Sequence, residues 1–284
     1  MAGTLYVVAT PIGNLQDMTP RAAATFGSVD FIAAEDTRVT LKLLNHLGLK
    51  KPMVSYYEHN AAERGTMIID RILAGESCAV CSDAGMPCIS DPGELLVKDA
   101  HAAGITVVPV PAASASATAL AVSGQATGRW CFEGFLPMNK NQRRERLAEL
   151  RDERRTMIFY EAPHKLNATL ADLAAAFGGQ RSISICRELT KLHEEIFKTT
   201  LEEAVRRYQE NPPKGEFCLV VAGAEPKAAE EKTLTLQDAV QLVFGLIEEG
   251  KAPSAACKEA ARLTGRTKGE LYTAYLAAKE EEEK

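Results

Sequence analysis

The sequence predicts an α/β protein made of two α/β domains, followed by a small C-terminal helical unit. Short apolar runs of strand length alternate with segments of helical length through most of the chain. Polar stretches containing Pro or Gly follow the ends of successive runs, and the last part of the chain is helical only. The predicted domains are residues 1–124, 125–224 and 233–284.

The composition is that of an ordinary globular protein, with 46% hydrophobic and 25% charged residues in a chain of 284. No apolar run approaches the ~20 residues that a membrane helix needs. The N-terminus resembles a first strand more than a signal peptide, so we expect a cytoplasmic location. Cys78 and Cys81 lie three apart in a predicted strand and so on opposite faces. We therefore expect no metal site and no disulfide bond.

The charge is unevenly distributed along the chain. The net charge is −5, but residues 138–227 carry 16 basic and 14 acidic residues and form the only positive third. An anionic partner would most naturally contact this part. The basic stretch 140–155 is interpreted first as a solvated helix face with i, i+4 ion pairs.

The first domain is predicted from five apolar runs of strand length, separated by helical segments. The predicted strands are residues 5–9, 31–34, 53–57, 78–81 and 105–110. Polar clusters follow each of them, at residues 10–14, 35–38, 58–60, 82–91 and 111–114. In a parallel sheet these clusters share one edge, which favours an active site over five unrelated solvated loops.

The stretch 82–93 is the centre of this prediction. Gly85 allows a close approach to the backbone because it has no Cβ. Asp91 suits the N-cap of the next helix, Pro92 its first position and Glu94 its third, as in a capping box. Thr19 and Pro20 predict a helix start by the same reasoning. A tight turn without a ligand is the competing interpretation of residues 82–93.

The second domain is predicted from strands at residues 130–135, 156–160 and 182–186. Residues 196–200 and 216–222 are predicted to form an antiparallel pair on either side of a helix at 201–210. Residues 223–232 are interpreted as a polar linker. Three short helices are then expected at 235–249, 253–264 and 268–279, with a helix-turn-helix-like unit in their second half.

Several common motifs of parallel sheets are absent from the sequence. It has no G-x-G-x-x-G after a strand, no G-x-x-x-x-G-K-[ST] and no G-x-S-x-G. The common dinucleotide site, the P-loop and the serine hydrolase elbow are therefore excluded. The remaining interpretation is a crevice that binds a small molecule without any of these three motifs.

A family resemblance rests on seven stretches that occur in order along the chain. They are Leu5-Tyr-Val-Val-Ala-Thr-Pro-Ile-Gly-Asn-Leu15, Ala34-Glu-Asp-Thr-Arg38, Ser82-Asp-Ala-Gly85, Ile89-Ser-Asp-Pro-Gly93, Phe132-Glu-Gly-Phe-Leu-Pro137, Phe159-Tyr-Glu-Ala-Pro-His164 and Arg187-Glu-Leu-Thr-Lys-Leu-His-Glu-Glu195. Together they resemble the bacterial ribosomal RNA small-subunit methyltransferase I family of the tetrapyrrole methylase superfamily. The second and last stretches separate this family from the corrin- and haem-pathway members.

The resemblance implies a tetrapyrrole methylase-like fold with a donor-binding cleft between the two α/β domains, and S-adenosylmethionine as the methyl donor. It implies a cytidine ribose 2′-hydroxyl in the decoding region of 16S rRNA as the acceptor. It also implies a homodimer and no catalytic metal. The acidic net charge suggests in addition that the RNA is recognised within the assembled 30S subunit, where shape contributes to recognition. By motif position, the donor site would be formed by Pro11, Gly13, Ser82, Asp83, Ala84, Gly85, Met86, Ile89, Ser114, Leu136, Pro163 and Glu188.

The methyl transfer itself is an in-line displacement, for which positioning of the hydroxyl is the main requirement. A base that accepts the hydroxyl proton is sought among Glu35, Asp36, Glu161 and Lys191, and Lys191 would need a lowered pKa. The candidates for RNA contacts are Asn14, Arg38, His59, Arg64, His164, Arg187 and His193. For each of them an ion pair or a loop contact within the domain is the alternative.

Two positions depart from the family pattern. Met86 stands where the family usually has threonine, and Pro111-Ala-Ala-Ser114 where it usually has Pro-Gly-Pro-Ser. A lost hydrogen bond at Met86 or a Cβ at Ala112 would weaken donor binding. These departures leave open a donor-binding RNA or assembly factor with weakened catalysis. The superfamily also leaves open a tetrapyrrole C-methyltransferase, against which the Ala34–Arg38 and Arg187–Glu195 stretches speak.

Overall fold

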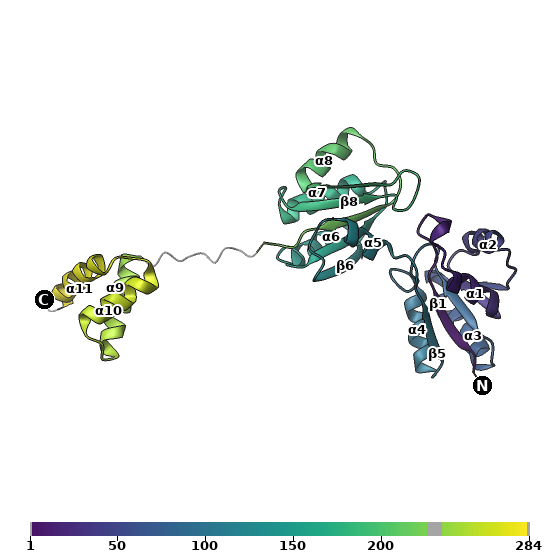
Figure 1. Cartoon of the computed structure of the whole chain (residues 1–284), viewed down its shortest axis with the longest axis horizontal. Coiled ribbons are helices and arrows are strands. Elements are labelled where there is room, and N and C mark those ends of the chain that lie inside the picture. Colours follow the sequence, from purple (N-terminus) through teal and green to yellow (C-terminus); the bar gives the residue numbers. More distant parts are fainter. Residues whose placement is uncertain (1, 226–234, 283–284) are drawn as a thin grey trace. The chain divides into compact units, whose positions relative to one another are not determined.

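The computed structural model describes residues 2–225 and 235–282, and the chain divides into two compact units. The larger unit is Met1–Ala224 and the smaller one Glu225–Lys284 (Figure 1). Most of the predicted linker, residues 226–232, lies outside the described residues. Among the described helices, none has both the length and the apolar character needed to cross a bilayer.

The first sheet of the larger unit is fully parallel, as the alternation of strands and helices predicts. Its strand order is β3-β2-β4-β1-β5. The strands are β1 (Thr4–Val8), β2 (Phe31–Ala34), β3 (Met53–Ser55), β4 (Cys78–Cys81) and β5 (Thr106–Val110). The connection that leaves β1 and the connection that leaves β4 run toward opposite sides of the sheet, so the strand order changes direction between these two neighbours. In open parallel sheets, ligands bind at such a point, beyond the carboxyl ends of the strands.

Helices cover both faces of this sheet. They are α1 (Pro20–Ser28), α2 (Thr37–His46), α3 (Ala61–Leu73) and α4 (Gly93–Ala102). One core cluster joins Leu5 and Cys78 to α3 and α4, and the other joins Val8 and Cys81 to α1 and α2. The two cysteines of the C-x-x-C therefore do lie on opposite faces of β4. Two short 3₁₀ turns, η1 (Leu15–Asp17) and η2 (Glu58–Asn60), follow β1 and β3.

The helix starts match the sequence signals to different degrees. The Thr19 hydroxyl accepts from the backbone N–H of Ala22, which confirms the predicted cap of α1. The capping box predicted at α4 is wrong, because α4 begins at Gly93 and its N-cap residue is Pro92. The Asp91 carboxylate instead accepts from the Gly93 N–H over 2.7 Å. The aspartate still satisfies a donor of the first turn, although the helix begins one position later than expected.

The second sheet is mixed, with the strand order β6-β7-β10-β8-β9. Its strands are β6 (Trp130–Phe135), β7 (Thr156–Glu161), β8 (Ser182–Arg187), β9 (Glu195–Thr200) and β10 (Phe217–Val221). The predicted antiparallel pairing of residues 196–200 with 216–222 is wrong. The strand β10 lies between β7 and β8, and β9 pairs with the outer edge of β8. Local patterns show which residues form strands, but not which strands are neighbours.

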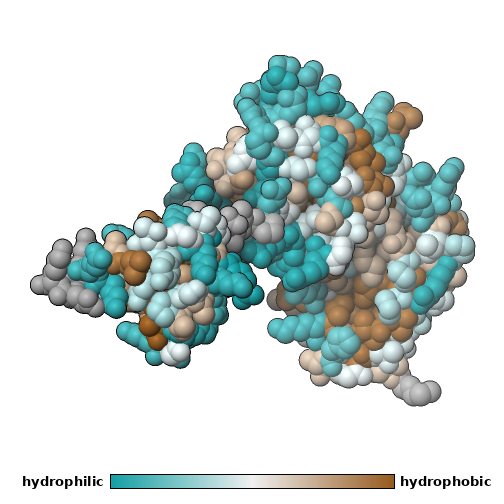
Figure 2. All heavy atoms as spheres, turned by 60° about the vertical axis from the view of Figure 1, so that its left-hand side comes forward, coloured by the Kyte–Doolittle hydropathy of each residue, from teal (hydrophilic) through white to brown (hydrophobic). Residues whose placement is uncertain are grey.

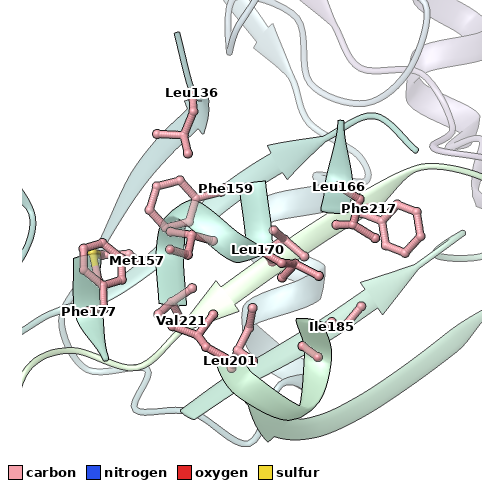
Figure 3. Packing of buried hydrophobic residues seen from close by; sticks show 14 of the residues in the cluster. Leu136, Met157, Phe159, Leu166, Leu170, Phe177, Ile185, Leu201, Phe217 and Val221 are labelled. Carbon is pink, nitrogen blue, oxygen red and sulfur yellow. The ribbon is translucent and has the colours of Figure 1, made fainter. Parts of the chain in front are cut away.

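One face of the second sheet carries three helices over a large apolar core (Figure 3). The helices are α6 (Lys140–Glu149), α7 (Leu166–Phe177) and α8 (Leu201–Glu210). Met157, Phe159 and Leu170 are fully buried in this cluster. The basic stretch after Asn139 is an exposed helix face, as expected, and its arginines form ion pairs both within the stretch and across elements. Arg143 contacts Asp172 on α7, and Arg146 contacts Glu133 on β6.

The opposite face of the second sheet is covered by α5 (Ala115–Val122), the helix that follows the last strand of the first sheet. Ala119 and Leu120 of α5 pack with Ile158, Cys186 and other side chains of β7, β8 and β10. This packing connects the two sheets directly. The domain boundary at residue 124 stays a prediction.

The smaller unit is a three-helix cluster that matches the three predicted helices closely. Its helices are α9 (Leu236–Glu248), α10 (Pro253–Thr264) and α11 (Lys268–Glu282). Thr235 and Asp238 form a capping box at the start of α9. Val243, Cys257 and Leu271 are fully buried and join the helices in a small core of their own.

Candidate functional site

A cavity of about 380 Å³ lies where loops of the first sheet meet the second sheet. This volume falls within the usual range for small-molecule sites. Its walls come from the loops after β1 and β4, the segment before α5, and the ends of β6, β7, β8 and β10. The lining residues are Ile12, Ala84, Gly85, Met86, Ile89, Ser114, Ala115, Phe135, Tyr160, Glu161, Ala162, Pro163, Cys186, Leu189, Lys191, Glu216, Phe217 and Cys218.

The loops after β1 and β4 are bound to each other at the rim. Thr10 and Gly85 form an isolated antiparallel bridge, with N–H to carbonyl distances of 2.9 and 3.1 Å. Gly85 has φ of +81°, and a Cβ there would lie 3.1 Å from the Ile12 side chain. A glycine is therefore required by both conformation and space.

Half of the residues predicted to bind a donor line this cavity. They are Ala84, Gly85, Met86, Ile89, Ser114 and Pro163. Pro11, Gly13, Ser82 and Asp83 line a neighbouring cavity of about 210 Å³, together with residues of α2 such as Lys42. The same two loops thus contribute to both cavities.

The remaining two donor-site candidates have other contacts. Leu136 is 9% exposed and belongs to the apolar core under α6 and α7 (Figure 3), and Phe135 beside it lines the cavity instead. The Glu188 carboxylate accepts from the Lys191 ammonium and from the backbone N–H of Glu216, each over 2.9 Å. Glu188 therefore fixes the position of two lining residues.

Lys191 lies in the cavity wall as a paired cation. Its Nζ is 2.9 Å from Glu188 Oε1 and 2.7 Å from Glu216 Oε2. Partial burial works to lower the pKa of Lys191, but the hydrogen bonds and charges of Glu216 and Glu188 outweigh it and leave the pKa raised. A lysine that acts as a base needs the opposite shift. Lys191 is therefore suited to orient a ligand and not to accept a proton.

Glu161 is buried at the end of β7, with only 5% exposed. Its two oxygens accept from the backbone N–H of Ala162 over 2.9 Å and from the Thr169 hydroxyl over 2.5 Å. Both oxygens thus serve local structure, which ties the end of β7 to α7.

Glu35 and Asp83 join the loops after β2 and β4. The Asp83 backbone N–H donates to the Glu35 carboxylate over 3.3 Å, and the Asp36 N–H donates to the Asp83 carboxylate over 3.1 Å. Burial raises the pKa of Glu35, and the charges of Asp83, Asp91 and Asp36 add to this while the Asp83 hydrogen bond opposes it. Burial also raises the pKa of Asp83. The raised pKa of Glu35 is the shift that a proton acceptor requires, although Glu35 is not among the residues that line the two cavities.

Asp36 differs from Glu35 although it is adjacent in sequence. It is the N-cap of α2, and its hydrogen bonds with Arg38 lower its pKa to about 2. Such a carboxylate stays ionised and holds Arg38 in place.

The candidates for RNA contacts are spread along the larger unit. Arg38, His59, Arg64, His164 and His193 are exposed. Asn14 caps η1 by accepting from the Gln16 N–H. Arg187 is half-buried and contacts Glu195 and the Lys214 carbonyl.

Several lining residues were not predicted, among them Tyr160, Phe135 and Glu216. The Tyr160 hydroxyl accepts from the Ser116 N–H over 3.0 Å, and its ring packs edge-on against Phe132 and Phe135. Glu216, the residue directly before β10, also lines the cavity. Tyr160 and Phe135 lie within the matched motifs, which was a usable signal, whereas no local pattern marks Glu216.

Residues in the left-handed backbone region gather in two segments at the site. Cys88 and Ser90 have φ of 68° and 62°, and Glu188 and Thr190 have φ of 51° and 66°. Non-glycine residues adopt this region at a cost, and such residues cluster at functional sites. Of the two departures from the family pattern, Met86 lines the cavity, while the lining residues do not include Ala112.

Comparison with known proteins identifies the family. The family model for tetrapyrrole (corrin/porphyrin) methylases matches residues 4–205, so the chain belongs to the tetrapyrrole methylase family. The chain is 46% identical over 270 residues to ribosomal RNA small subunit methyltransferase I of Synechocystis, covering 95% of this chain and 96% of the relative. It is 48% identical over 274 residues to the protein of that name from Halalkalibacterium halodurans, covering 96% and 94%. Within the family, its curated relatives are thus the ribosomal RNA small subunit methyltransferases I.

Solved structures of the same fold confirm the architecture. The methyltransferase CobJ superposes with a TM-score of 0.61 at 19% identity, covering 78% of this chain and 95% of that one. Uroporphyrin-III C-methyltransferase from Thermus thermophilus, complexed with S-adenosylhomocysteine, superposes with a TM-score of 0.56 at 14% identity, covering 77% and 97%. At these identities the two likenesses show the fold alone.

Proposed function

We propose that this chain transfers the methyl group of S-adenosylmethionine to the ribose 2′-hydroxyl of a cytidine in the decoding region of 16S rRNA. The observation that carries the proposal is the cavity at the carboxyl edge of the first sheet, formed by the stretches on which the family resemblance rests. The 46–48% identity to ribosomal RNA small subunit methyltransferases I supports the RNA substrate.

The residues present fit such a donor. Ile12, Met86 and Leu189 offer apolar surface for a purine ring, and Ser114 and the Lys191–Glu216 pair offer polar contacts for an amino acid group. Gly85 leaves the backbone accessible where a Cβ would meet Ile12. When bound, S-adenosylmethionine supplies a methyl group that its positive sulfur has already activated.

The protein's own contribution is to orient the acceptor and remove its proton. Glu35 is the proposed proton acceptor, because its pKa is raised by burial and it lies on the loop tied to Asp83. A positioned base contributes about 10²–10⁴-fold in rate. Lys191 and Glu161 are proposed as positioning residues, and Asp36 as the residue that holds Arg38 toward the RNA.

The partners proposed are the 30S subunit and a second copy of this chain, with the cytoplasm as the location. Figure 2 shows apolar residues gathered into a patch on the surface of the larger unit, which suits an interface between copies. The strand β5 is also an edge of its sheet. Closed dimers are the commonest assembly of such chains.

The test combines donor binding with methyl transfer. Calorimetry with S-adenosylmethionine should show binding, and radiolabelled transfer to 30S particles from a strain that lacks the modification should place the label on a cytidine ribose. Label on a base would contradict the proposed acceptor. Donor binding without any transfer would favour a donor-binding assembly factor instead.

A further inference from the structure

A second cavity, of about 400 Å³, lies on the other face of the second sheet. It is bounded by the end of β8, the start of β9, the end of α8 and the turn before β10. Among the described residues, none lines both this cavity and the first one. Cys186 lines the first cavity and Arg187 the second, because consecutive residues of a strand point to opposite faces.

Positive charge exceeds negative charge in this second cavity. Its lining includes three cations, Arg187, Arg207 and Lys214, and one carboxylate, Glu195. Glu195 contacts both guanidinium groups, and the Arg187 Nη1 distance is 3.5 Å. Arg187 Nε also donates to the Lys214 carbonyl over 2.6 Å, and Arg207 lies 4.2 Å above the Phe197 ring. The arginines are thereby held in place with only part of their five N–H donors used.

Tyr208 provides an independent sign of a ligand. The residue is only 5% exposed, and its buried hydroxyl has no hydrogen-bond partner within residues 2–225 and 235–282. Its ring is fixed edge-on against Phe217, with the centroids 5.5 Å apart. Burial raises the pKa of Tyr208 to about 12, and the Glu195 charge adds to this. The group is therefore a phenol whose proton needs an acceptor, and orphaned buried donors of this kind are rare.

We infer that this cavity binds a phosphate group of the RNA strand, with Arg207 and Lys214 supplying charge and Tyr208 a hydrogen bond. Guanidinium groups match phosphate oxygens in geometry as well as charge. The inference rests on the proposed function, since the first cavity would hold the donor against one ribose of the same strand. The two cavities flank the ends of β8 and β10, so one strand passing this edge can contact both. Arg187 joins this site as the residue that positions the Lys214 backbone.

The decisive comparison uses two neighbouring arginines of α8. Arg207→Gln removes a charge that lines the cavity, whereas Arg206→Gln removes one from an exposed side chain paired with Glu203. With unmodified 30S particles, we expect Arg207→Gln to raise KM about tenfold and to reduce the salt slope of binding by about 0.7–0.9. The kcat and the affinity for S-adenosylmethionine should not change. Equal KM values for the two variants would overturn the inference.

The variant Tyr208→Phe tests whether the Tyr208 hydroxyl binds the ligand or only stabilises the fold. It removes only the hydroxyl, so we expect KM for 30S particles to rise about threefold to tenfold, as one lost hydrogen bond implies. The thermal midpoint should stay equal or rise, since no partner in the described structure is lost. A lower thermal midpoint with unchanged KM would mean a purely structural hydroxyl.

Inorganic phosphate tests the alternative ligand, which is a small free anion in place of a phosphate group of the RNA. If it binds the intact protein and Arg207→Gln abolishes this binding without changing KM for 30S particles, the cavity serves a small anion and the RNA assignment is wrong. If the unaltered protein transfers no methyl group to 30S particles at all, the proposed function fails instead.

Discussion

The side chain of Lys191 packs directly onto the backbone of Gly13, so that a Cβ at residue 13 would lie 2.4 Å from Lys191 Cγ. This contact joins the loop after β1 to the loop after β8, which lie at the edges of the two sheets. Gly13 also has φ of +147°. The position therefore favours glycine for both space and conformation.

Gly13→Ala should displace Lys191 from its pairs with Glu188 and Glu216. We expect the affinity for S-adenosylmethionine to fall about tenfold, which is about 1.4 kcal/mol. Calorimetry measures this directly. The matched control is Gly128→Ala, since a Cβ there meets nothing within 4 Å. Unchanged affinity in Gly13→Ala would show that the contact is not needed for the donor.

The pH dependence of stability should show the ion pairs of Lys191. Because its folded-state pKa is raised, its stabilisation is complete below the unfolded value of about 10.4 and is lost as the pH rises through the folded value. Thermal midpoints of the unaltered protein and Lys191→Met should therefore differ at neutral pH and converge in the alkaline range. The exposed Lys140→Met serves as the control and should give no such convergence.

We expect Glu35→Gln to lose reaction rate and Glu161→Gln to lose stability. If Glu35 accepts the proton, Glu35→Gln lowers kcat about 10²–10⁴-fold with little loss of stability. Glu161→Gln weakens two buried hydrogen bonds, so we expect a loss of about 1–3 kcal/mol in the free energy of unfolding. Single-turnover rates and denaturant unfolding measure the two effects. A large rate loss in a stably folded Glu161→Gln would reverse the assignment.

Met86→Thr restores the residue that is usual in the resembled family. The side chain of Met86 lines the cavity and packs against the core between the first sheet, α3 and α4. We expect a donor affinity up to about tenfold higher if the hydroxyl gains a hydrogen bond, together with a lower thermal midpoint from lost packing. Calorimetry and thermal unfolding of the same sample distinguish the two effects. A weaker donor affinity would mean that the methionine itself contacts the ligand.

Local sequence patterns were sufficient for the elements and for part of the site. Apolar runs identified the strands, and Thr19 identified the start of α1. The loop around Gly85 was found because a strand end, a glycine and a helix start adjoin in sequence. Leu136 shows the limit, since its motif position suggested a wall residue while its side chain packs into the core.

The parts of the fold and of the first cavity that could not be predicted depend on contacts between residues far apart in the chain. Glu216 reaches Lys191 only because β10 is inserted between β7 and β8. The packing of α5 on the second sheet likewise joins a helix to strands that come later in sequence. Neither arrangement leaves a periodic signal, because pairing is determined by the total burial of the sheet and not by any single strand.

The central place of β10 also bears on the order in which the molecule can be completed during synthesis. Since β10 is the last strand of its sheet in sequence, β7 and β8 keep one unpaired edge until residue 221 has left the ribosome. Until then the nascent chain lacks the wall that residues 216–218 give to the first cavity. The growing polypeptide therefore completes its first cavity only after more than three quarters of it has been translated.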